Sequence, residues 1–232
     1  MIDQSISVFL PVRKGSQRVE HKNTRQFADF KNGLLELKLT QLSKLSIVDE
    51  VILSTNDEKC IEVGREFQSL FPKLKIVTRP DNLATNSVDL IDLVNYVPSV
   101  CKSKHILWTH VTSPFVDEID YEKAILSYYN SIELGFDSLM SVQSFRNFLW
   151  GKDENDLVNR CTRQKWPRTQ DLKDLYEIDS AIFLTNRNTY INESDRIGNK
   201  PYLYVQDKSK SFDIDWEDDF KIAEIMYNSL NK

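Results

Sequence analysis

The stretch ISVFLPVRKGSQRVEHKN, from Ile6 to Asn23, decides how the rest of the chain is interpreted. It opens with an apolar run, rich in β-branched and aromatic residues, that predicts a buried strand. A polar loop follows at once and contains Gly15 and the basic residues Arg13 and Lys22. Glycine lets a backbone approach a ligand closely, and successive N–H groups in a turn can hold an anion. The stretch therefore indicates either a polyphosphate site at the end of the first strand or a solvated basic loop.

This loop lacks the spacing of two common phosphate-binding motifs. The sequence contains neither the G-x-x-x-x-G-K-[ST] of a P-loop nor the G-x-G-x-x-G of a dinucleotide site. The phosphate hypothesis therefore depends on the planar fork of Arg13, the point charge of Lys22 and the loop amides.

Composition limits the class of protein. The chain has 232 residues, 41% of them hydrophobic, which suits one large domain with a sizeable core. Its net charge of -5 argues against a nucleic-acid partner, which usually requires a basic surface. No apolar run approaches the roughly 20 residues of a membrane span, and the first residues lack a signal-peptide pattern. Three cysteines without metal-ligand spacing suit a reducing compartment, so we predict a cytoplasmic protein with no membrane partner.

Predicted strands and helices alternate along most of the chain. Strands are predicted at 51–55, 74–77, 104–108, 180–185 and 201–205, and helices at 34–45, after Asn56, at about 87–97, at 117–134 and after Asp215. We expect Asn56 to cap the helix that follows it. Such alternation predicts a Rossmann-like α/β fold, with a mostly parallel sheet and helices on both faces. Ligands of such sheets bind beyond the carboxyl ends of the strands.

Residues 142–178 break this alternation. They include Phe145, Phe148, Trp150 and Trp166 and follow no long period. We interpret the segment as a two-stranded arm inserted into a single domain of residues 1–232. Exposed aromatic residues usually mark an interface, and two-fold dimers are the commonest assembly. The segment therefore predicts a homodimer, and the alternative is an arm folded back on its own core.

Two carboxylates near the end of the chain have the spacing of a metal site. In an extended segment Asp213 and Asp215 point to one side, and Phe212 and Ile214 point to the other. Two carboxylates with phosphate oxygens and water form the usual magnesium arrangement. The structural alternative is that Asp215 caps the helix that follows and Asp213 is solvated.

The loop after the first strand resembles that of the CMP-sialic acid synthetases, the acylneuraminate cytidylyltransferases, which are related to CMP-Kdo synthetase. The family loop reads roughly R-x-G-S-K-x-(I/L)-x-x-K-N, and Arg13, Gly15-Ser16 and Lys22-Asn23 are similar to it. Lys14 stands where a second Gly is usual, and Gln17 stands where Lys is usual, so Lys14 could restore the charge lost at Gln17. The resemblance implies the fold type of the nucleotide-diphospho-sugar transferases, with a protruding dimerisation arm.

The end of the chain resembles the same family. Its last helix opens with D-I-D-x-x-x-D-(L/F), and residues 213–220 read DIDWEDDF. The family's two aspartates hold a metal, which implies Mg²⁺ on Asp213 and Asp215. Arg79-Pro80 with Leu83-Ala84 resembles the family's R-P-x-x-L-A-x-D loop, which reaches the nucleotide. On residues alone, Arg79 is either such a contact or a surface arginine.

Other segments resemble the family's acceptor site. Thr112-Ser113-Pro114 matches the end of its Q-P-T-S-P loop, with His110 in place of Gln. His110 therefore contacts the acceptor, helps to deprotonate it, or is simply hydrogen-bonded at a strand end. Arg168, followed by Gln170, resembles the arm arginine that binds the sugar carboxylate, often in the partner subunit's site. Lys152 is a second candidate from the arm.

The resemblance implies a cytidylyltransferase that moves CMP from CTP to an acidic sugar, a sialic or other nonulosonic acid, and releases pyrophosphate, for surface polysaccharide synthesis. It assigns catalysis to Arg13, Lys22, Asp213 and Asp215, and nucleotide binding to Arg13, Gly15, Ser16, Lys22, Asn23 and Arg79. Asp179 and Ser180 replace the family's usual Asn and Gly. Such departures leave open a different acidic acceptor, such as a phosphonate, or a non-catalytic nucleotide- or sugar-binding homologue.

Overall fold

The computed structural model describes residues 4–85 and 89–230 of the chain. The strands are β1 (Ile6–Val12), β2 (Glu50–Thr55), β3 (Leu74–Thr78), β4 (His105–Trp108), β5 (Ser138–Phe145), β6 (Trp150–Gly151), β7 (Asp156–Leu157), β8 (Leu175–Asn186) and β9 (Pro201–Val205). The helices are α1 (Gly33–Ser43), α2 (Glu58–Gln68), α3 (Leu90–Val100), α4 (Glu118–Glu133), α5 (Arg187–Glu193) and α6 (Glu217–Leu230), with short 3₁₀ turns at Asp81–Leu83 and Thr169–Asp171.

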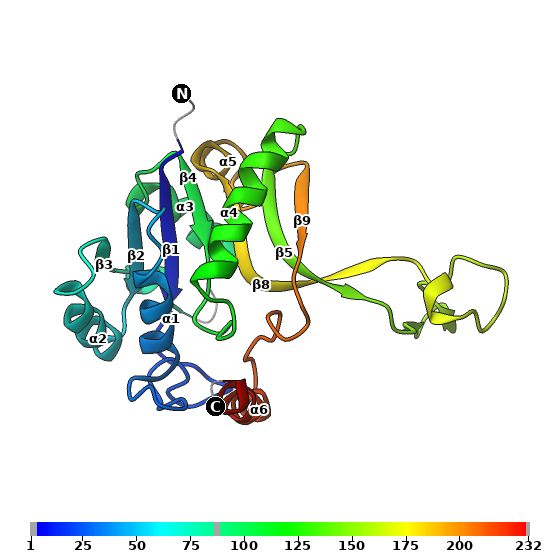
Figure 1. Ribbon diagram of the computed structural model, residues 1–232, viewed down its shortest axis with the longest axis horizontal. Helices are drawn as coiled ribbons and strands as arrows, with labels where there is room; N and C mark the ends of the chain where they lie inside the picture. Colours follow the sequence, from blue (N-terminus) through cyan, green and yellow to red (C-terminus); the bar gives the residue numbers. More distant parts are fainter. Residues whose placement is uncertain (1–3, 86–88, 231–232) are drawn as a thin grey trace.

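A mostly parallel sheet forms the centre of the molecule (Figure 1). Its seven strands have the order β3-β2-β1-β4-β8-β5-β9. β8 runs antiparallel to β4 and β5, whereas the other neighbouring pairs are parallel. The expected α/β fold is confirmed.

β1 is an interior strand of the sheet, between β2 and β4, and its side chains are mostly apolar on both faces, as in buried parallel strands. Val8 and Leu10 pack in a core with α1, α2 and α4. Phe9 points the other way, into a second core with α3 and α5. Helices therefore cover both faces, and the polar loop that follows β1 lies at the open carboxyl edge.

One local expectation needs correction, one helix was missed, and one predicted helix start is not tested. Asn56 does not cap α2: Asp57 is the N-cap and accepts a hydrogen bond from the Lys59 backbone N–H, while Asn56 accepts one from the Lys14 backbone N–H at 2.9 Å. Helix α5 was not predicted, because seven residues are too few for a helical period to show. The predicted start of α3 near residue 87 lies outside the described residues, and the described helix begins at Leu90.

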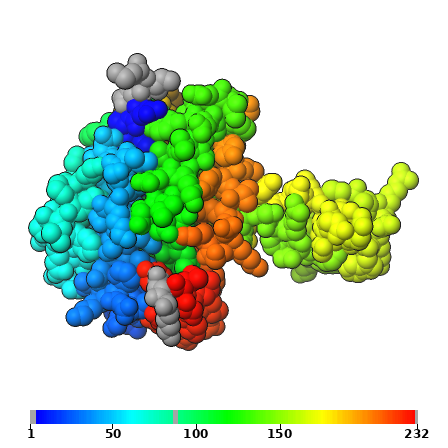
Figure 2. Space-filling view, in the orientation of Figure 1, coloured from blue at the N-terminus to red at the C-terminus, as the bar shows by residue number. Residues whose placement is uncertain are grey.

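Residues 146–174 extend away from the rest of the molecule (Figures 1 and 2). The long pair of β5 and β8 carries them, with Phe145 opposite Leu175 at its outer end. Phe148, Trp150 and Trp166 meet in this extension, and Trp166 is 63% exposed. Its role in dimerisation stays a prediction. None of the helices in the described ranges has the length and apolar character needed to cross a bilayer.

Candidate active site

Polar residues from the carboxyl ends of several strands line a cavity of about 580 Å³. The predicted site residues that share it are Arg13, Ser16, Lys22, Asn23, Arg79, His110, Thr112, Asp213 and Asp215. They follow β1, β3 and β4 or precede α6, and Figure 1 shows α6 beside the segment between β1 and α1. The structure thus brings most of the predicted nucleotide and metal residues to one place.

The loop after β1 separates this cavity from a neighbouring one of about 590 Å³, which Gly15 lines. Gly15 has a φ of 78°, a conformation that favours glycine, and an added Cβ would meet nothing within 4 Å. Lys14 does not restore the charge lost at Gln17, because its Nζ pairs with Glu58 at 2.7 Å. Gly15 therefore allows the backbone conformation of the loop, while Lys14 attaches the loop to α2.

Lys22 joins the loop to the segment that carries the two aspartates. Its Nζ donates a hydrogen bond to the carbonyl of Ile214 at 2.7 Å, across 192 residues of sequence. Burial lowers the pKa of Lys22, and the charges of Asp213 and Asp215 partly oppose that shift. A cation thus lies beside both carboxylates at the edge of the phosphate loop.

Asp213 and Asp215 both face the cavity, while Ile214 between them is fully buried. Burial raises the pKa of Asp213, and the charge of Asp215 raises it further, against a hydrogen bond from Thr112. The alternation expected for an extended segment is therefore present. A neighbouring carboxylate that raises the pKa of Asp213 in this way favours a cation beside the pair.

Asp215 is not a helix cap. The carboxylate of Asp219 accepts the backbone N–H groups of Asp215 and Trp216, at 3.1 and 2.7 Å. Asp215 instead forms an ion pair with Arg18 at 3.2 Å, and the Arg18 guanidinium lies over the Trp216 ring. The structural alternative for Asp215 is therefore wrong.

The two aspartates fit a magnesium ion that takes its remaining ligands from phosphate and water. In residues 4–85 and 89–230, no group of three or more His, Cys, Asp or Glu side chains could hold a metal. The two carboxylates would therefore supply only part of the ligands of such an ion, and phosphate oxygens and water would have to supply the others.

Arg79 is a buried residue and not a surface arginine. It is 3% exposed, and its guanidinium donates to the carbonyl of Ser54 at 2.7 Å and to the Ser54 hydroxyl at 3.3 Å. Burial lowers its pKa to about 10. Arg79 is thus fixed against the end of β2 and presents a positive charge at the wall of the cavity.

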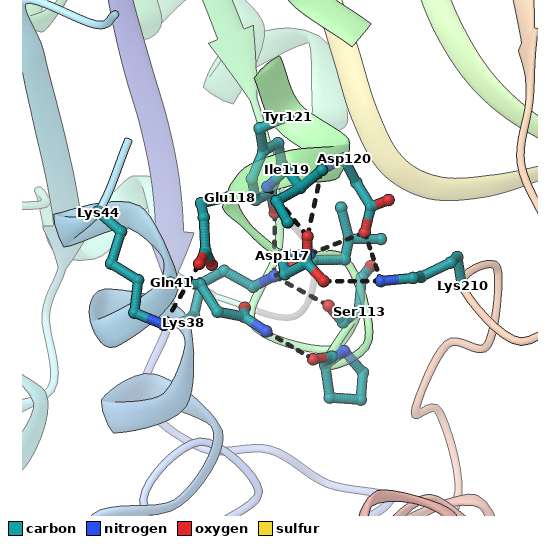
Figure 3. A network of polar contacts seen from close by, with 12 residues as sticks. Lys38, Gln41, Lys44, Ser113, Asp117, Glu118, Ile119, Asp120, Tyr121 and Lys210 are labelled. Carbon is teal, nitrogen blue, oxygen red and sulfur yellow. Dashed lines mark hydrogen bonds and ion pairs between the residues drawn. The ribbon is translucent and has the colours of Figure 1, made fainter. Parts of the chain in front are cut away.

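Side chains of helix α1 support the loop that follows β4 (Figure 3). Lys38 is fully buried, and its Nζ donates to the carbonyls of Ser113 and Val116 and to the Tyr121 hydroxyl, each at 2.9 Å. Burial lowers the pKa of Lys38 to about 7. Gln41 adds a hydrogen bond to the carbonyl of Pro114 at 2.8 Å.

This anchored loop supports the aspartate segment. The Thr112 carbonyl accepts the Ile214 backbone N–H at 3.0 Å, and the Thr112 side chain hydrogen-bonds Asp213. The Ser113 side chain is buried, does not line the cavity, and its hydroxyl has no hydrogen-bond partner among the described residues. Of the two residues assigned to the acceptor, the structure therefore places Thr112 at the cavity and Ser113 behind it.

His110 is held as a neutral ring. The Trp108 indole N–H donates to its Nε2 at 3.0 Å, so the ring proton resides on Nδ1. Burial, followed by the charges of Arg196 and Lys22, lowers the pKa of His110 to about 3. A nitrogen that already accepts a hydrogen bond, on a ring with so low a pKa, is not suited to take a proton from the acceptor. A hydrogen bond to a ligand suits the ring better than base catalysis does.

The arm residues lie apart from the cavity within one chain. Arg168, Gln170 and Lys152 are exposed and do not line it. The guanidinium of Arg168 binds both carboxylate oxygens of Asp171, at 2.8 and 3.1 Å. The structure of a single chain therefore does not unite these residues with the others.

Several lining residues were not predicted. Gln17, Arg18, Trp108 and Ser180 also face the cavity. Arg18 lies in the basic loop and could have been included on charge alone, whereas Trp108 had only the signature of a strand. Asp179 is 5% exposed and accepts hydrogen bonds from the side chains of Ser141, Gln206 and Ser211 and from a backbone N–H. It anchors β8 to its neighbours and is not free to bind a sugar.

The family model described as cytidylyltransferase matches residues 7–228, nearly the whole chain. The chain belongs to the cytidylyltransferase family. One relative of this chain is the N-acylneuraminate cytidylyltransferase of Streptococcus agalactiae serotype V, which is 24% identical to it over 220 residues. The matched region covers 91% of this chain and 50% of the relative. The pseudaminic acid cytidylyltransferase of Campylobacter jejuni subsp. jejuni serotype O:2 is 22% identical over 224 residues, 94% of each chain. The resemblance seen in the motifs is thus confirmed for the family, although the chain spans about half the length of the streptococcal relative.

Solved structures share the fold. A CMP:2-keto-3-deoxy-manno-octonic acid synthetase in complex with CTP superposes with a TM-score of 0.68 at 12% identity, covering 97% of this chain and 99% of the other. The 4-diphosphocytidyl-2C-methyl-D-erythritol synthase of Anaerococcus prevotii has a TM-score of 0.66 at 13% identity, with 97% and 96% covered. At these identities the likeness shows the architecture alone.

Proposed function

We propose that this cytidylyltransferase-family chain transfers CMP from CTP to an acidic sugar of the nonulosonic acid class and releases pyrophosphate. One observation carries the proposal: cations from the loop after β1 and from Arg79 share a single cavity with Asp213 and Asp215. The relatives named for N-acylneuraminate and pseudaminic acid support the class of acceptor.

The triphosphate would bind along the loop after β1. The loop amides, Arg13 and Ser16 offer hydrogen-bond donors to phosphate oxygens, and Arg79 adds a fixed charge. Lys22 lies between that loop and the aspartates, where negative charge would develop as pyrophosphate leaves. These residues act by position and charge, which is how proteins catalyse phosphoryl transfer.

Asp213 and Asp215 would hold Mg²⁺ together with the nucleotide. When bound, the ion would polarise the phosphoryl oxygens and stabilise the attacking and leaving oxygens. Arg18 neutralises Asp215 at 3.2 Å, so metal binding would compete with that ion pair. A homologue that only bound sugars or nucleotides would have little need of two carboxylates facing one cavity, and we favour the enzyme for this reason.

We also propose that two chains form a dimer through residues 146–174. The exposed rings of Phe148, Trp150 and Trp166 form an apolar group that a monomer would leave in water. In such a dimer Arg168 of one chain would reach the acceptor in the cavity of the other. Gln170 and Lys152 lie on the same extension and would be available there.

The test is a screen of pyrophosphate release with each of the four NTPs against a panel of acids, with Mg²⁺ or with a chelator. The panel contains N-acetylneuraminate, pseudaminate and a hydroxylated phosphonate. We expect release with CTP, Mg²⁺ and a nonulosonic acid. Lys22→Met should abolish it, and Lys221→Met, an exposed lysine on α6, should not. Release that is greater with another NTP, or absent with every acid, would reject the proposal.

A further inference from the structure

Arg196, in the connection between α5 and β9, carries a guanidinium that no acceptor within residues 4–85 and 89–230 satisfies. Its Cζ lies 3.8 Å from the centroid of the Phe183 ring and 5.1 Å from that of Trp108. In the described part of the chain, no hydrogen bond or ion pair reaches its guanidinium, although burial lowers its pKa. Its nitrogens are not among the fully buried polar atoms that lack partners, so they remain open to solvent.

The lack of an acceptor in the described residues sets Arg196 apart from Arg187 and from the buried Arg79. Arg187 donates to the carbonyls of Cys101 and Pro98, at 3.1 and 2.7 Å. Arg79 is satisfied in the same way by Ser54. A guanidinium presents five donors in a rigid fork, and those of Arg196 that face solvent are available to an anionic ligand. The two rings beneath it hold the side chain in place, so the donors are positioned before a ligand binds.

One of the two rings beneath Arg196, that of Trp108, lines the cavity. Trp108 on β4 is paired with Phe183 on β8, lines the cavity, and donates its N–H to His110. Of the charged groups that lower the pKa of His110, Arg196 has the largest effect. The guanidinium thus lies near His110, on the β4–β8 side of the sheet.

The phosphate-binding residues come from the other side. Arg13 and Lys22 follow β1, and Arg79 follows β3, whereas the sheet continues from β1 through β4 to β8. Asp213 and Asp215 line the cavity together with these cations and also line a second cavity beside β8. A CTP on the β1–β3 side would therefore leave the β4–β8 side for the acceptor.

We propose that Arg196 and His110 form the anion-binding end of the acceptor site and hold the carboxylate of the acidic sugar within the same chain. The proposal rests on the proposed function for the class of acceptor. The fork of Arg196 fits two carboxylate oxygens, and its contacts with the Phe183 and Trp108 rings hold the side chain in position. His110, with Nε2 occupied by Trp108, offers its Nδ1–H as a further donor. A carboxylate has room for about four hydrogen bonds, so an arginine from a partner's arm could bind it as well.

The decisive measurement compares an acid with its methyl ester, which lacks the charge. N-acetylneuraminate, pseudaminate and their methyl esters are the probes, and CTP is the donor. Arg196→Gln should raise the KM for the acid roughly tenfold to a hundredfold, the usual effect of losing a charge-assisted hydrogen bond, and leave the KM for CTP unchanged. The variant should also lose the preference for acid over ester. Arg196→Lys, which keeps the charge without the fork, should fall between, and Arg65→Gln, an exposed arginine on α2, should match the parent.

Direct binding separates this proposal from the proposed function. Saturation-transfer NMR, with CMP and Mg²⁺ present, reports acid and ester binding without turnover. Acid binding that depends on Arg196, in a protein that releases no pyrophosphate, would support the anion site and reject the transfer reaction. Turnover in which Arg196→Gln keeps the parent's preference for acid over ester would reject the anion site and leave the reaction standing. A protein that binds none of these acids, or an Arg196→Gln variant that weakens CTP and acid equally, would also overturn the assignment.

Discussion

Charged side chains at the carboxyl edge of the sheet and those at the tip of the arm differ in how far along the sequence their partners lie. At the edge, charged groups contact partners far away in sequence: Lys22 binds the carbonyl of Ile214, and Lys38 binds those of Ser113 and Val116. On the arm, Arg168 pairs with Asp171 three residues away, and its side chain is 72% exposed.

The difference indicates which region is complete in one chain. Buried charged side chains at the carboxyl edge are held by contacts within one chain, so their positions do not depend on a partner subunit. The arm holds Arg168 and Asp171 in an exposed local pair that contributes little, and it leaves Trp150 and Trp166 exposed. We therefore expect changes at the edge to alter chemistry in every chain, and changes on the arm to act through assembly.

The largest effect should come from the two aspartates at the edge. Asp213→Asn and Asp215→Asn should each lower pyrophosphate release on the order of a hundredfold or more, because a bound metal supplies several kcal/mol of transition-state stabilisation. Unfolding midpoints should change little, since Asp219 caps α6. Asp218→Asn, at an exposed position of α6, is the matched control. Turnover near the parent's in both variants would remove the metal assignment.

The next effect tests the arm. Asp213→Asn and Arg168→Ala should each be impaired alone, and mixing the two after subunit exchange should restore activity. If arms are shared, the mixed dimer places both lesions in one site and leaves the other intact. Light scattering gives the oligomeric state before any assay. A monomer, or a mixture that stays inactive, would show that the arm acts within its own chain or not at all.

A moderate effect should appear in the pH dependence of stability. The folded pKa of Lys38 is about 7, below the 10.5 of an unfolded lysine, so the unfolded chain binds more protons between these values. Stability should therefore rise from pH 7 towards 10, by at most about 1.4 kcal/mol per pH unit from this group. Urea unfolding should show that slope in the parent and in Lys44→Met, but not in Lys38→Met. An unchanged slope in Lys38→Met would mean that another group is responsible.

The smallest effect concerns His110. Because its folded pKa is about 3, its ring should not titrate between pH 5 and 8, and the proton should stay on Nδ1. Nitrogen-15 NMR of the ring measures both its pKa and which nitrogen carries the proton. Trp108→Phe removes the donor to Nε2, and that nitrogen should then become easier to protonate. A His110 signal that titrates near pH 6.5 in the parent would restore base catalysis as an explanation.

Buried strands were the easiest features to predict. The strand expected at 51–55 agrees within one residue with β2, all of whose residues are buried, because a short apolar run rich in β-branched residues favours a buried strand. Details set by one hydrogen bond were less secure: Asn56 and Asp57 are equally good caps by residue type, and the structure uses Asp57. Lys38 had the signature of an ordinary helix lysine, and only its partners across the fold show why it is buried.

The sequence by itself predicted most core strands and helices, the basic loop after β1 and the alternation around Ile214, because each depends on neighbours along the chain. It did not predict β5 or α5. Tertiary structure alone decided that β8 would insert between β4 and β5, which brings Phe183 beside Trp108 and gives Arg196 its two rings. It also decided that Lys22 would meet a segment 192 residues away. Such contacts depend on how separate elements pack in three dimensions, and no local pattern of apolar and polar residues encodes them.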